Sequence, residues 1–148
     1  MPLRALVLAV FAAVACDNLG LSGEPERLNV DVEAVGADRI IMVSSTNWVY
    51  MNDPACNPDE QACPAILRVL GADSTTVDVP VSRTFEFTRD FRYYIQVFPA
   101  DGVTATVRMT IDIDGKPWYD EARELRPNGN DGEQESLEFI YRWRQPTL

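Results

Sequence analysis

Apolar and polar residues alternate along most of the chain after residue 27, which is the period of a β-strand. The clearest runs are 28–34 and 103–113, where every second residue is apolar and most residues between are polar or charged. Patterns of this kind are typical of antiparallel strands that pack one face on a core and expose the other to water. Further strands are expected over 40–50, 65–70, 77–81, 85–87, 91–97, 116–125 and 137–143, and Asp114-Gly115 predicts a hairpin turn.

No stretch after residue 26 has the 3.6-residue apolar period of an amphipathic helix. Seven to nine strands joined by turns rich in Gly, Pro, Asn and Asp are typical of a β-sandwich. Prolines fall at the edges of the runs, as a sheet protein requires. We therefore predict an all-β fold, an antiparallel β-sandwich, with an immunoglobulin-like Greek key as the preferred connectivity.

The N-terminus has the features of an export signal. Arg4 supplies a positive charge, and residues 5–15 form an apolar run of eleven residues without a charge. About 20 apolar residues are needed to span a bilayer, so this run is too short for a transmembrane helix. It has the length of the apolar part of a secretory signal peptide, and the small residues at 13 and 15 suit a cleavage site before Cys16.

The sequence Ala13-Val14-Ala15-Cys16 resembles the lipobox of bacterial lipoproteins, with alanine at the position where leucine is usual. The resemblance implies cleavage before Cys16, acylation of its thiol and a palmitate-type anchor on the extracytoplasmic side of a membrane of the bacterial cell envelope. The alternative is an ordinary secretory signal peptide, with Cys16 used for another purpose.

The cysteine count agrees with this interpretation. The chain has three cysteines, and an odd number in an exported protein leaves one thiol to be explained. Lipidation of Cys16 explains it, and Cys56 and Cys63 remain as a pair. Exported proteins meet an oxidising compartment, so we predict a Cys56–Cys63 disulfide that closes a short polar loop. The predicted organisation is a signal peptide (1–15), a lipidated cysteine with a flexible tether (16–26) and a β-sandwich domain (27–148).

Charge and composition exclude several functions. The chain has 13 Lys and Arg against 23 Asp and Glu, a formal charge of −10, and it has no histidine. An acidic surface disfavours nucleic acid and anionic lipid headgroups as partners. The absence of histidine removes Ser-His-Asp and Cys-His catalysis and the most common zinc ligand. We expect no cofactor.

Residues 91–143 carry a second, family-level similarity. The hairpin Thr106–Lys116, of the form T-V-x-x-x-I-x-x-D-G-K, is followed by a closing aromatic strand. This part of the chain is similar to small bacterial envelope proteins of the mycobacterial-small-membrane-protein type, which are accessory proteins of lipid transporters. The similarity implies an immunoglobulin-like sandwich, and we transfer none of that family's function.

Two acidic segments are candidate cation sites. Asp112 and Asp114 form a D-x-D-G string of the kind used in calcium loops, but Pro117 and Trp118 follow where further ligands would be needed. Asp131 and Glu133 lie in the acidic segment 128–135. A hairpin turn and a charged surface loop are the preferred interpretations, so we predict no metal site.

The aromatic residues occur in pairs. Trp48 with Tyr50 and Tyr141 with Trp143 are spaced by two, so each pair shares one face of a strand, and burial in the core is the preferred interpretation. Trp118, next to a predicted hairpin turn, is the candidate for an exposed ring that stacks on a sugar.

The sequence contains no recognisable catalytic motif. Our preferred hypothesis is therefore a non-catalytic envelope lipoprotein whose sandwich is a protein-interaction module with an envelope protein as partner. The alternative is a module that binds carbohydrate or calcium, and a small hydrolase that uses paired carboxylates is the third hypothesis.

Overall fold

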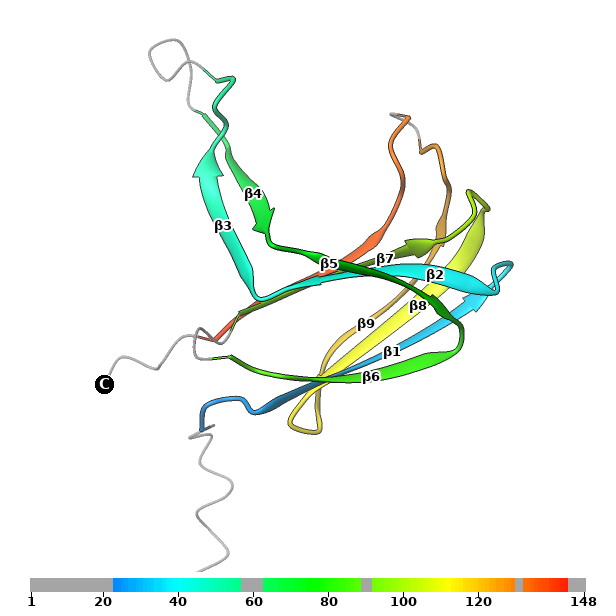
Figure 1. Cartoon of the computed structure of the whole chain (residues 1–148), viewed down its shortest axis with the longest axis horizontal. Helices are drawn as coiled ribbons and strands as arrows, with labels where there is room; N and C mark the ends of the chain where they lie inside the picture. Colours follow the sequence, from blue (N-terminus) through cyan, green and yellow to red (C-terminus); the bar gives the residue numbers. More distant parts are fainter. Residues whose placement is uncertain (1–22, 57–62, 89–91, 130–131, 144–148) are drawn as a thin grey trace, which may run out of the picture.

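The computed structural model describes residues 23–56, 63–88, 92–129 and 132–143, and these residues form ten strands and no helix (Figure 1). The strands are β1 (Arg27–Val35), β2 (Arg39–Ser45), β3 (Asn47–Asn52), β4 (Ala65–Leu70), β5 (Asp73–Asp78), β6 (Val81–Glu86), β7 (Arg92–Pro99), β8 (Ala105–Ile113), β9 (Lys116–Leu125) and β10 (Leu137–Arg142). Alternating polarity and β-branched or aromatic residues favour an extended backbone in these segments.

Eight of the ten strands build two four-stranded sheets that face each other. One sheet has the order β6-β1-β8-β9 and the other β10-β7-β2-β5, and every pairing is antiparallel. The antiparallel β-sandwich is therefore confirmed. The two large sheets contain eight strands, within the expected seven to nine, and β3 and β4 form a separate two-stranded sheet.

The sandwich consists of two long antiparallel ribbons. In the first ribbon, β1 pairs with β6, β2 with β5 and β3 with β4. This ribbon contributes two strands to each sheet, and its β3–β4 end projects from the molecule. In the second, β7 and β8 pair with β10 and β9. The ribbons are joined through β1 with β8 and through β2 with β7.

This connectivity differs from the immunoglobulin-like Greek key that we expected. The four-stranded sheet of an immunoglobulin domain contains two pairs of neighbours that are consecutive along the chain. Among the described strands of the two large sheets, only β8 and β9 are both consecutive and adjacent. The reason is that, within the two long ribbons, most strands that pair with each other are not consecutive along the chain.

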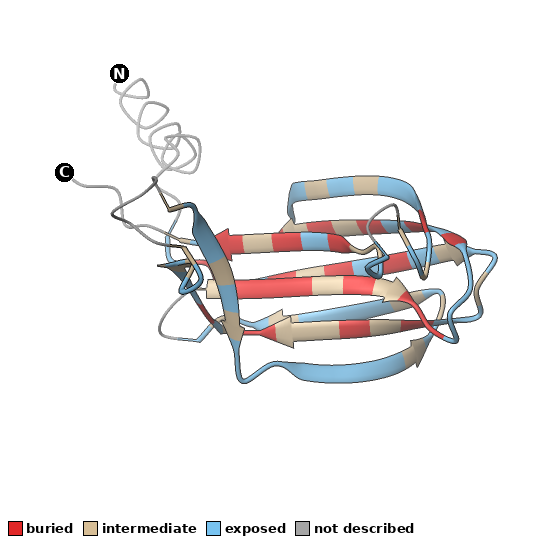
Figure 2. Ribbon diagram, turned by 90° about the horizontal axis from the view of Figure 1, so that it is seen from above, coloured by how far each residue is buried: buried red, intermediate tan, exposed pale blue. Residues whose placement is uncertain are grey.

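The core lies between the two sheets and follows the sequence alternation. In β8 every second residue is buried, as are Leu28, Val30 and Val32 in β1, and the residues between them are intermediate or exposed. Figure 2 shows such bands of buried and more exposed residues along the strands. Large fully buried side chains come from both sheets, among them Leu28, Ile40, Ile95, Met109 and Leu125. Burial of this apolar surface is the main stabilising contribution to the sandwich.

The predicted hairpin turn between β8 and β9 is confirmed. Asp114 has φ 50° and Gly115 has φ 74°, so both residues adopt the left-handed conformation that the preferred two-residue turn requires. The backbone N–H of Gly115 also donates to Asp112 Oδ1 at 3.1 Å. The side chain of Asp112, three residues before the glycine, therefore stabilises the turn.

Candidate functional site

A β-bulge in β9 determines where Trp118 points. Pro117 is the partner of Asp112 on β8 and Tyr119 is the partner of Ile111, so Trp118 is an extra residue between two paired ones. In a regular strand, neighbouring side chains would point to opposite faces. Here both rings contact β10: Trp118 meets Tyr141, and Tyr119 meets Phe139, with centroids 5.2 and 5.7 Å apart. Bulges commonly redirect side chains next to functional sites.

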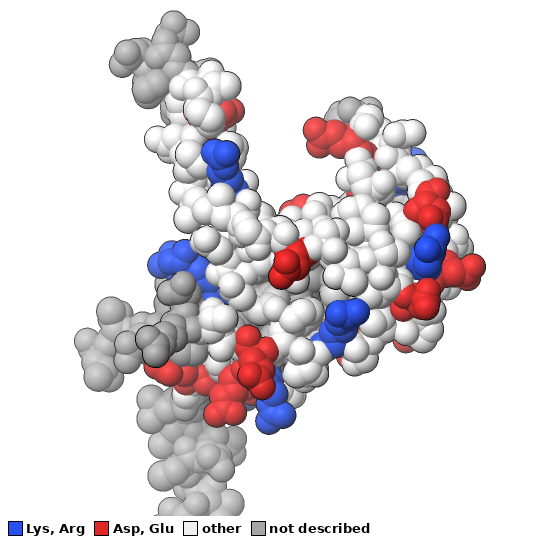
Figure 3. Space-filling view, in the orientation of Figure 1, with Lys and Arg blue, Asp and Glu red and all other residues white. Residues whose placement is uncertain are grey.

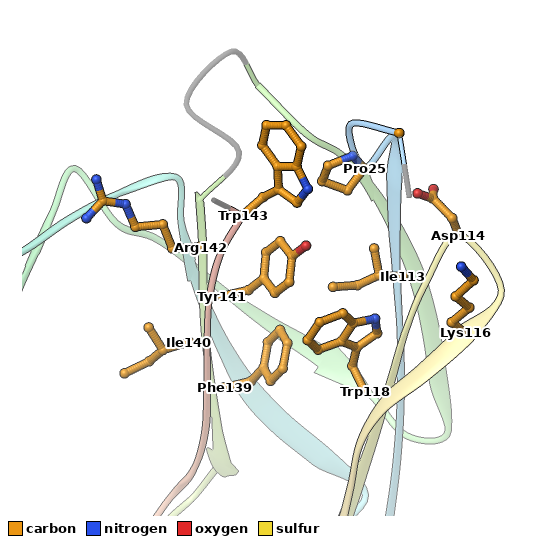
Figure 4. A pocket seen from close by; sticks show the side chains of 11 residues that line it. Pro25, Ile113, Asp114, Lys116, Trp118, Phe139, Ile140, Tyr141, Arg142 and Trp143 are labelled. Carbon is orange, nitrogen blue, oxygen red and sulfur yellow. The ribbon is translucent and has the colours of Figure 1, made fainter. Parts of the chain in front are cut away.

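The redirected Trp118 lines a groove of about 430 Å³ at one side of the sandwich. β9 and β10 are edge strands of different sheets, and the groove lies between β10 and the β8–β9 hairpin. Figure 4 shows Phe139, Tyr141 and Trp143 in a row on one side, with Trp118 opposite. Its volume lies within the range of small-molecule sites.

The groove combines exposed aromatic surface with a few polar groups. The Trp118 side chain is 55% exposed, whereas Phe139 and Tyr141 are buried in the wall. The Tyr141 hydroxyl points into the groove, with Asp114 and Lys116 opposite (Figure 4). Burial raises the pKa of Tyr141 above its usual value, and the negative charge of Asp114 raises it further. Tyr141 is therefore a neutral hydroxyl that can donate or accept a hydrogen bond.

The end of the predicted tether closes one end of this groove. Pro25 is buried and lines the groove with Ile113. Asp114 accepts hydrogen bonds from the backbone N–H groups of Glu26, at 3.2 Å from both carboxylate oxygens, and of Arg27, at 2.9 Å. The chain before β1 is therefore part of the groove wall and is held against the β8–β9 hairpin.

Of the acidic candidates, Asp112 and Asp114 have hydrogen-bond partners for their carboxylates within the fold. Asp112 Oδ1 accepts a hydrogen bond from Asn29 Nδ2 at 2.9 Å as well as the one from Gly115. Glu133 is exposed, and its backbone carbonyl accepts the N–H of Gly129 at 2.8 Å. Asp131 lies outside the described residues. Within the part of the chain that the structure describes, no three Asp, Glu or Cys residues are grouped so as to hold a metal ion.

A second unusual surface is the β3–β4 hairpin, called the arm below, which projects from the sandwich (Figure 1). Both of its faces carry exposed apolar side chains, namely Val49, Tyr50, Ile66 and Leu70. Figure 3 shows the arm as mostly uncharged surface, while Asp and Glu gather around the sandwich. The prediction that Trp48 and Tyr50 are both core residues is correct for Trp48, at 5% exposed, and wrong for Tyr50, at 58%. The ring of Tyr50 lies too far out along the arm to reach the core.

Trp48 attaches the arm to the sandwich. The guanidinium of Arg92, on β7, lies over the indole ring at 5.9 Å from its centroid, and Arg92 Nη1 donates to the Trp48 carbonyl at 3.3 Å. A cation placed over an indole ring is attracted by the negative face of the ring. The exposed ring of Tyr50 packs edge-on against Trp48 at 5.6 Å.

The predicted Cys56–Cys63 disulfide is confirmed, with an S–S distance of 2.05 Å. It lies beyond the ends of β3 and β4 and joins the two strands of the arm a second time. Before it, the side chain of Asp53 accepts the backbone N–H of Ala55 at 2.9 Å. Cys16 lies outside the described residues, so its lipidation stays a prediction.

No protein-family model, curated protein or solved structure matches the chain. Among residues 23–56, 63–88, 92–129 and 132–143, no helix is long and apolar enough to cross a membrane. Sequence reasoning singled out Trp118 and Asp114, which the fold brings to one groove. It missed the exposure of the arm and the position of Lys116 in the lining of the groove.

Proposed function

We propose that the protein is a non-catalytic envelope lipoprotein, anchored through a lipid on Cys16, whose sandwich binds another envelope protein through the arm. The proposed location is the extracytoplasmic side of a membrane of the bacterial cell envelope. The lipobox-like sequence at residues 13–16 supports the anchor, and the geometry of the arm supports the binding function.

The observation that carries the proposal is the exposed apolar surface of the arm. A two-stranded hairpin alone in water is marginally stable, and this one pairs with no other strand among the described residues. It still exposes Tyr50, Val49, Ile66 and Leu70, which would be more stable against an apolar partner. The disulfide holds the hairpin together without such a partner.

Charge indicates the chemistry of that partner. The segment between β3 and β4 contains Asp53, Asp59 and Glu60 and no Lys or Arg. Arg68 on β4 is the one Lys or Arg within the two strands, and the whole chain has a formal charge of −10. A second copy of the chain and an anionic lipid surface would both repel this end of the arm. The partner we propose is therefore a protein with an apolar cleft and a basic rim.

The arm is tested by site-specific photo-crosslinking in intact cells. A photoreactive phenylalanine analogue at Tyr50 should crosslink to a different protein, whereas the same analogue at Arg83, on the edge strand β6, should not. Adding Ile66→Asp to the Tyr50 probe should abolish the crosslink. A crosslink to a second copy of the chain, or equal crosslinking from both positions, would contradict the proposal.

The anchor is tested by the intact mass of the protein extracted from membranes. We expect the mass of residues 16–148 plus acyl chains, and Cys16→Ala should release the protein from the membrane fraction. Arg4 is the only charged residue among residues 1–15, so cleavage would change the formal charge from −10 to −11. A mature protein without acyl chains would overturn the anchor and leave the arm proposal standing.

Carbohydrate binding is the second candidate function, and the exposed ring of Trp118 in a groove with polar groups favours it. The corresponding calcium function has no supporting observation, because the oxygens of Asp112 and Asp114 accept hydrogen bonds within the fold. Asp114 is also the one carboxylate among the described residues that line the groove, so a pair for acid–base hydrolysis is not found there.

A further inference from the structure

We propose that the groove between β10 and the β8–β9 hairpin binds a neutral oligosaccharide, with Trp118 as its stacking platform. This inference goes beyond the binding of a protein by the arm. It uses a different surface of the sandwich, and it is independent of the lipid on Cys16.

Aromatic rings form two adjoining walls of the groove. Trp118 and Tyr141 are perpendicular, with an angle of 84° between their planes, and Trp143 continues the wall along β10 (Figure 4). Neighbouring aromatic contacts hold Tyr141 in place: Phe87 lies 5.3 Å away and Phe139 lies 6.4 Å away, centroid to centroid. Tyr141 and Phe139 are therefore packed and buried in the wall, and ordering packed side chains on binding costs less than ordering exposed ones.

The β-bulge in β9 is a second reason to assign a ligand to Trp118. A regular β9 would place Trp118 and Tyr119 on opposite faces, and only one of them would reach β10. The extra residue brings both to the same side, at the cost of a backbone pairing with β8. Tyr119 seals the core against Phe139, whereas Trp118 stays more than half exposed and contributes little to the core. An exposed indole in that position is available for a ligand.

The polar groups indicate the class of ligand. A sugar ring has an apolar C–H face and a rim of hydroxyls, and the groove has aromatic rings beside the Tyr141 hydroxyl and the Lys116 ammonium. An acyl chain would leave those polar groups without partners. An anionic ligand would meet Lys116, but it would also approach Asp114 and the exposed Glu24 and Glu26 at the same end of the sandwich, and the side chain of Arg142 extends away from the groove (Figure 4). A neutral saccharide satisfies both the rings and the hydrogen-bonding groups.

A proline-containing peptide is the competing ligand, because Pro25 already packs at one end of the groove. Aromatic grooves that bind extended proline-rich segments are well established. However, Asp114 fixes the backbone after Pro25 by three contacts, which makes this segment part of the groove wall rather than a model of a ligand.

The test is a binding titration of the purified full chain with short linear oligosaccharides of glucose and of N-acetylglucosamine. Saturation-transfer NMR and tryptophan fluorescence report binding. Trp118→Ala should weaken binding by about tenfold or more, as expected for an aromatic anchor. Trp118→Phe should restore part of it, and the matched control Tyr50→Ala, which removes an equally exposed ring from the arm, should leave binding unchanged.

Because the Trp118 side chain is 55% exposed, Trp118→Ala should keep the fold, which circular dichroism verifies. The proposal is overturned if none of these oligosaccharides binds the wild-type chain, or if Trp118→Ala binds as well as wild type. Binding at Trp118 of a proline-rich peptide alone would also overturn it. None of these results affects the arm, since the crosslinking experiment reports on that surface separately.

Discussion

The Ser45 hydroxyl donates a hydrogen bond to the Leu70 carbonyl at 2.7 Å, where the first ribbon leaves the sandwich to form the arm. The same oxygen accepts the backbone N–H of Asn47 at 3.0 Å. Ser45 is 5% exposed, and among the described residues it is the one residue of the polar or charged class that is buried. One hydroxyl therefore joins β2, β3 and β4 at the point where the backbone changes direction.

Ser45→Ala should destabilise this junction. The substitution removes the hydrogen bonds that the buried hydroxyl makes with the Leu70 carbonyl and the Asn47 N–H, and a hydrogen bond of this kind typically contributes about 0.5–1.5 kcal/mol. We expect a lower free energy of unfolding in urea and faster amide hydrogen exchange in β3 and β4. The matched control is Ser82→Ala on β6, where the side chain is exposed and the expected change is within about 0.5 kcal/mol. Unchanged exchange in the arm would contradict the role of Ser45.

The alternation of apolar and polar residues predicted most strands of the sandwich, because each of these strands buries one face in the core. The run 103–113 predicted that Val107, Met109 and Ile111 are buried, and all three are. The same argument failed at 40–50, which we expected as one strand. The structure divides it at Thr46, since the apolar residues on both sides of that point do not reveal that the ribbon leaves the sheet.

The candidate site was predictable only in part. Trp118 and Asp114 were singled out because of their residue type and their place near a turn. Their meeting in one groove depends on the bulge, which arises from the register between β8 and β9, and on β10, which comes from the other sheet. Neither the register nor the strand order follows from a period of two, so the groove could not be derived from the sequence.

The disulfide should stabilise the arm and leave the sandwich almost unchanged. Cys56 and Cys63 are seven positions apart, and closing so short a loop contributes about 2 kcal/mol by restricting the unfolded chain. In a Cys56→Ser, Cys63→Ser double variant, amide exchange in β3 and β4 should accelerate. Exchange in β8, at the centre of its sheet, serves as the internal control. Equal acceleration in β8 would show that the arm and the sandwich unfold together.

Asp114 should stabilise the end of the groove where the chain before β1 packs against the β8–β9 hairpin. Asp114→Ala removes the acceptor for the N–H groups of Glu26 and Arg27 and places alanine at φ 50°, so we expect a loss of about 2 kcal/mol. Asp114→Asn keeps one acceptor oxygen and tolerates the left-handed conformation, so its loss should be smaller. Urea unfolding and amide exchange at Glu26 and Arg27 measure both effects. Equal losses in the two variants would contradict this explanation.

Calcium should leave the melting temperature unchanged. Oxygens of Asp112 and Asp114 already accept hydrogen bonds from Asn29, from Gly115 and from the backbone at the start of β1. A ligand that binds the native state and not the unfolded state raises the melting temperature, and the rise grows with the logarithm of the ratio of ligand concentration to Kd. Differential scanning calorimetry with millimolar calcium and with a chelator is the measurement. A calcium-dependent rise would restore the cation-binding interpretation of the D-x-D-G string.

The buried tyrosines should make the fold sensitive to alkali. Burial raises the pKa of Tyr93 and of Tyr94 to about 12, and the negative charges of Asp73 and Glu138 add to the respective shifts. An unfolded tyrosine ionises near pH 10. Between these values the native state holds protons that the unfolded state has lost, so stability is complete below pH 10 and decreases as pH rises towards 12.

The measurement is an absorbance titration of tyrosinate in the folded chain and in denaturant. In denaturant, all five tyrosines should ionise together near pH 10. In the folded chain, most of the absorbance change should come later and coincide with loss of the β-sheet signal in circular dichroism. Tyr93→Phe should remove part of the late change. If all five tyrosines ionised near pH 10 in the folded chain, the aromatic wall behind Tyr93 and Tyr141 would be open to water, contrary to the structure.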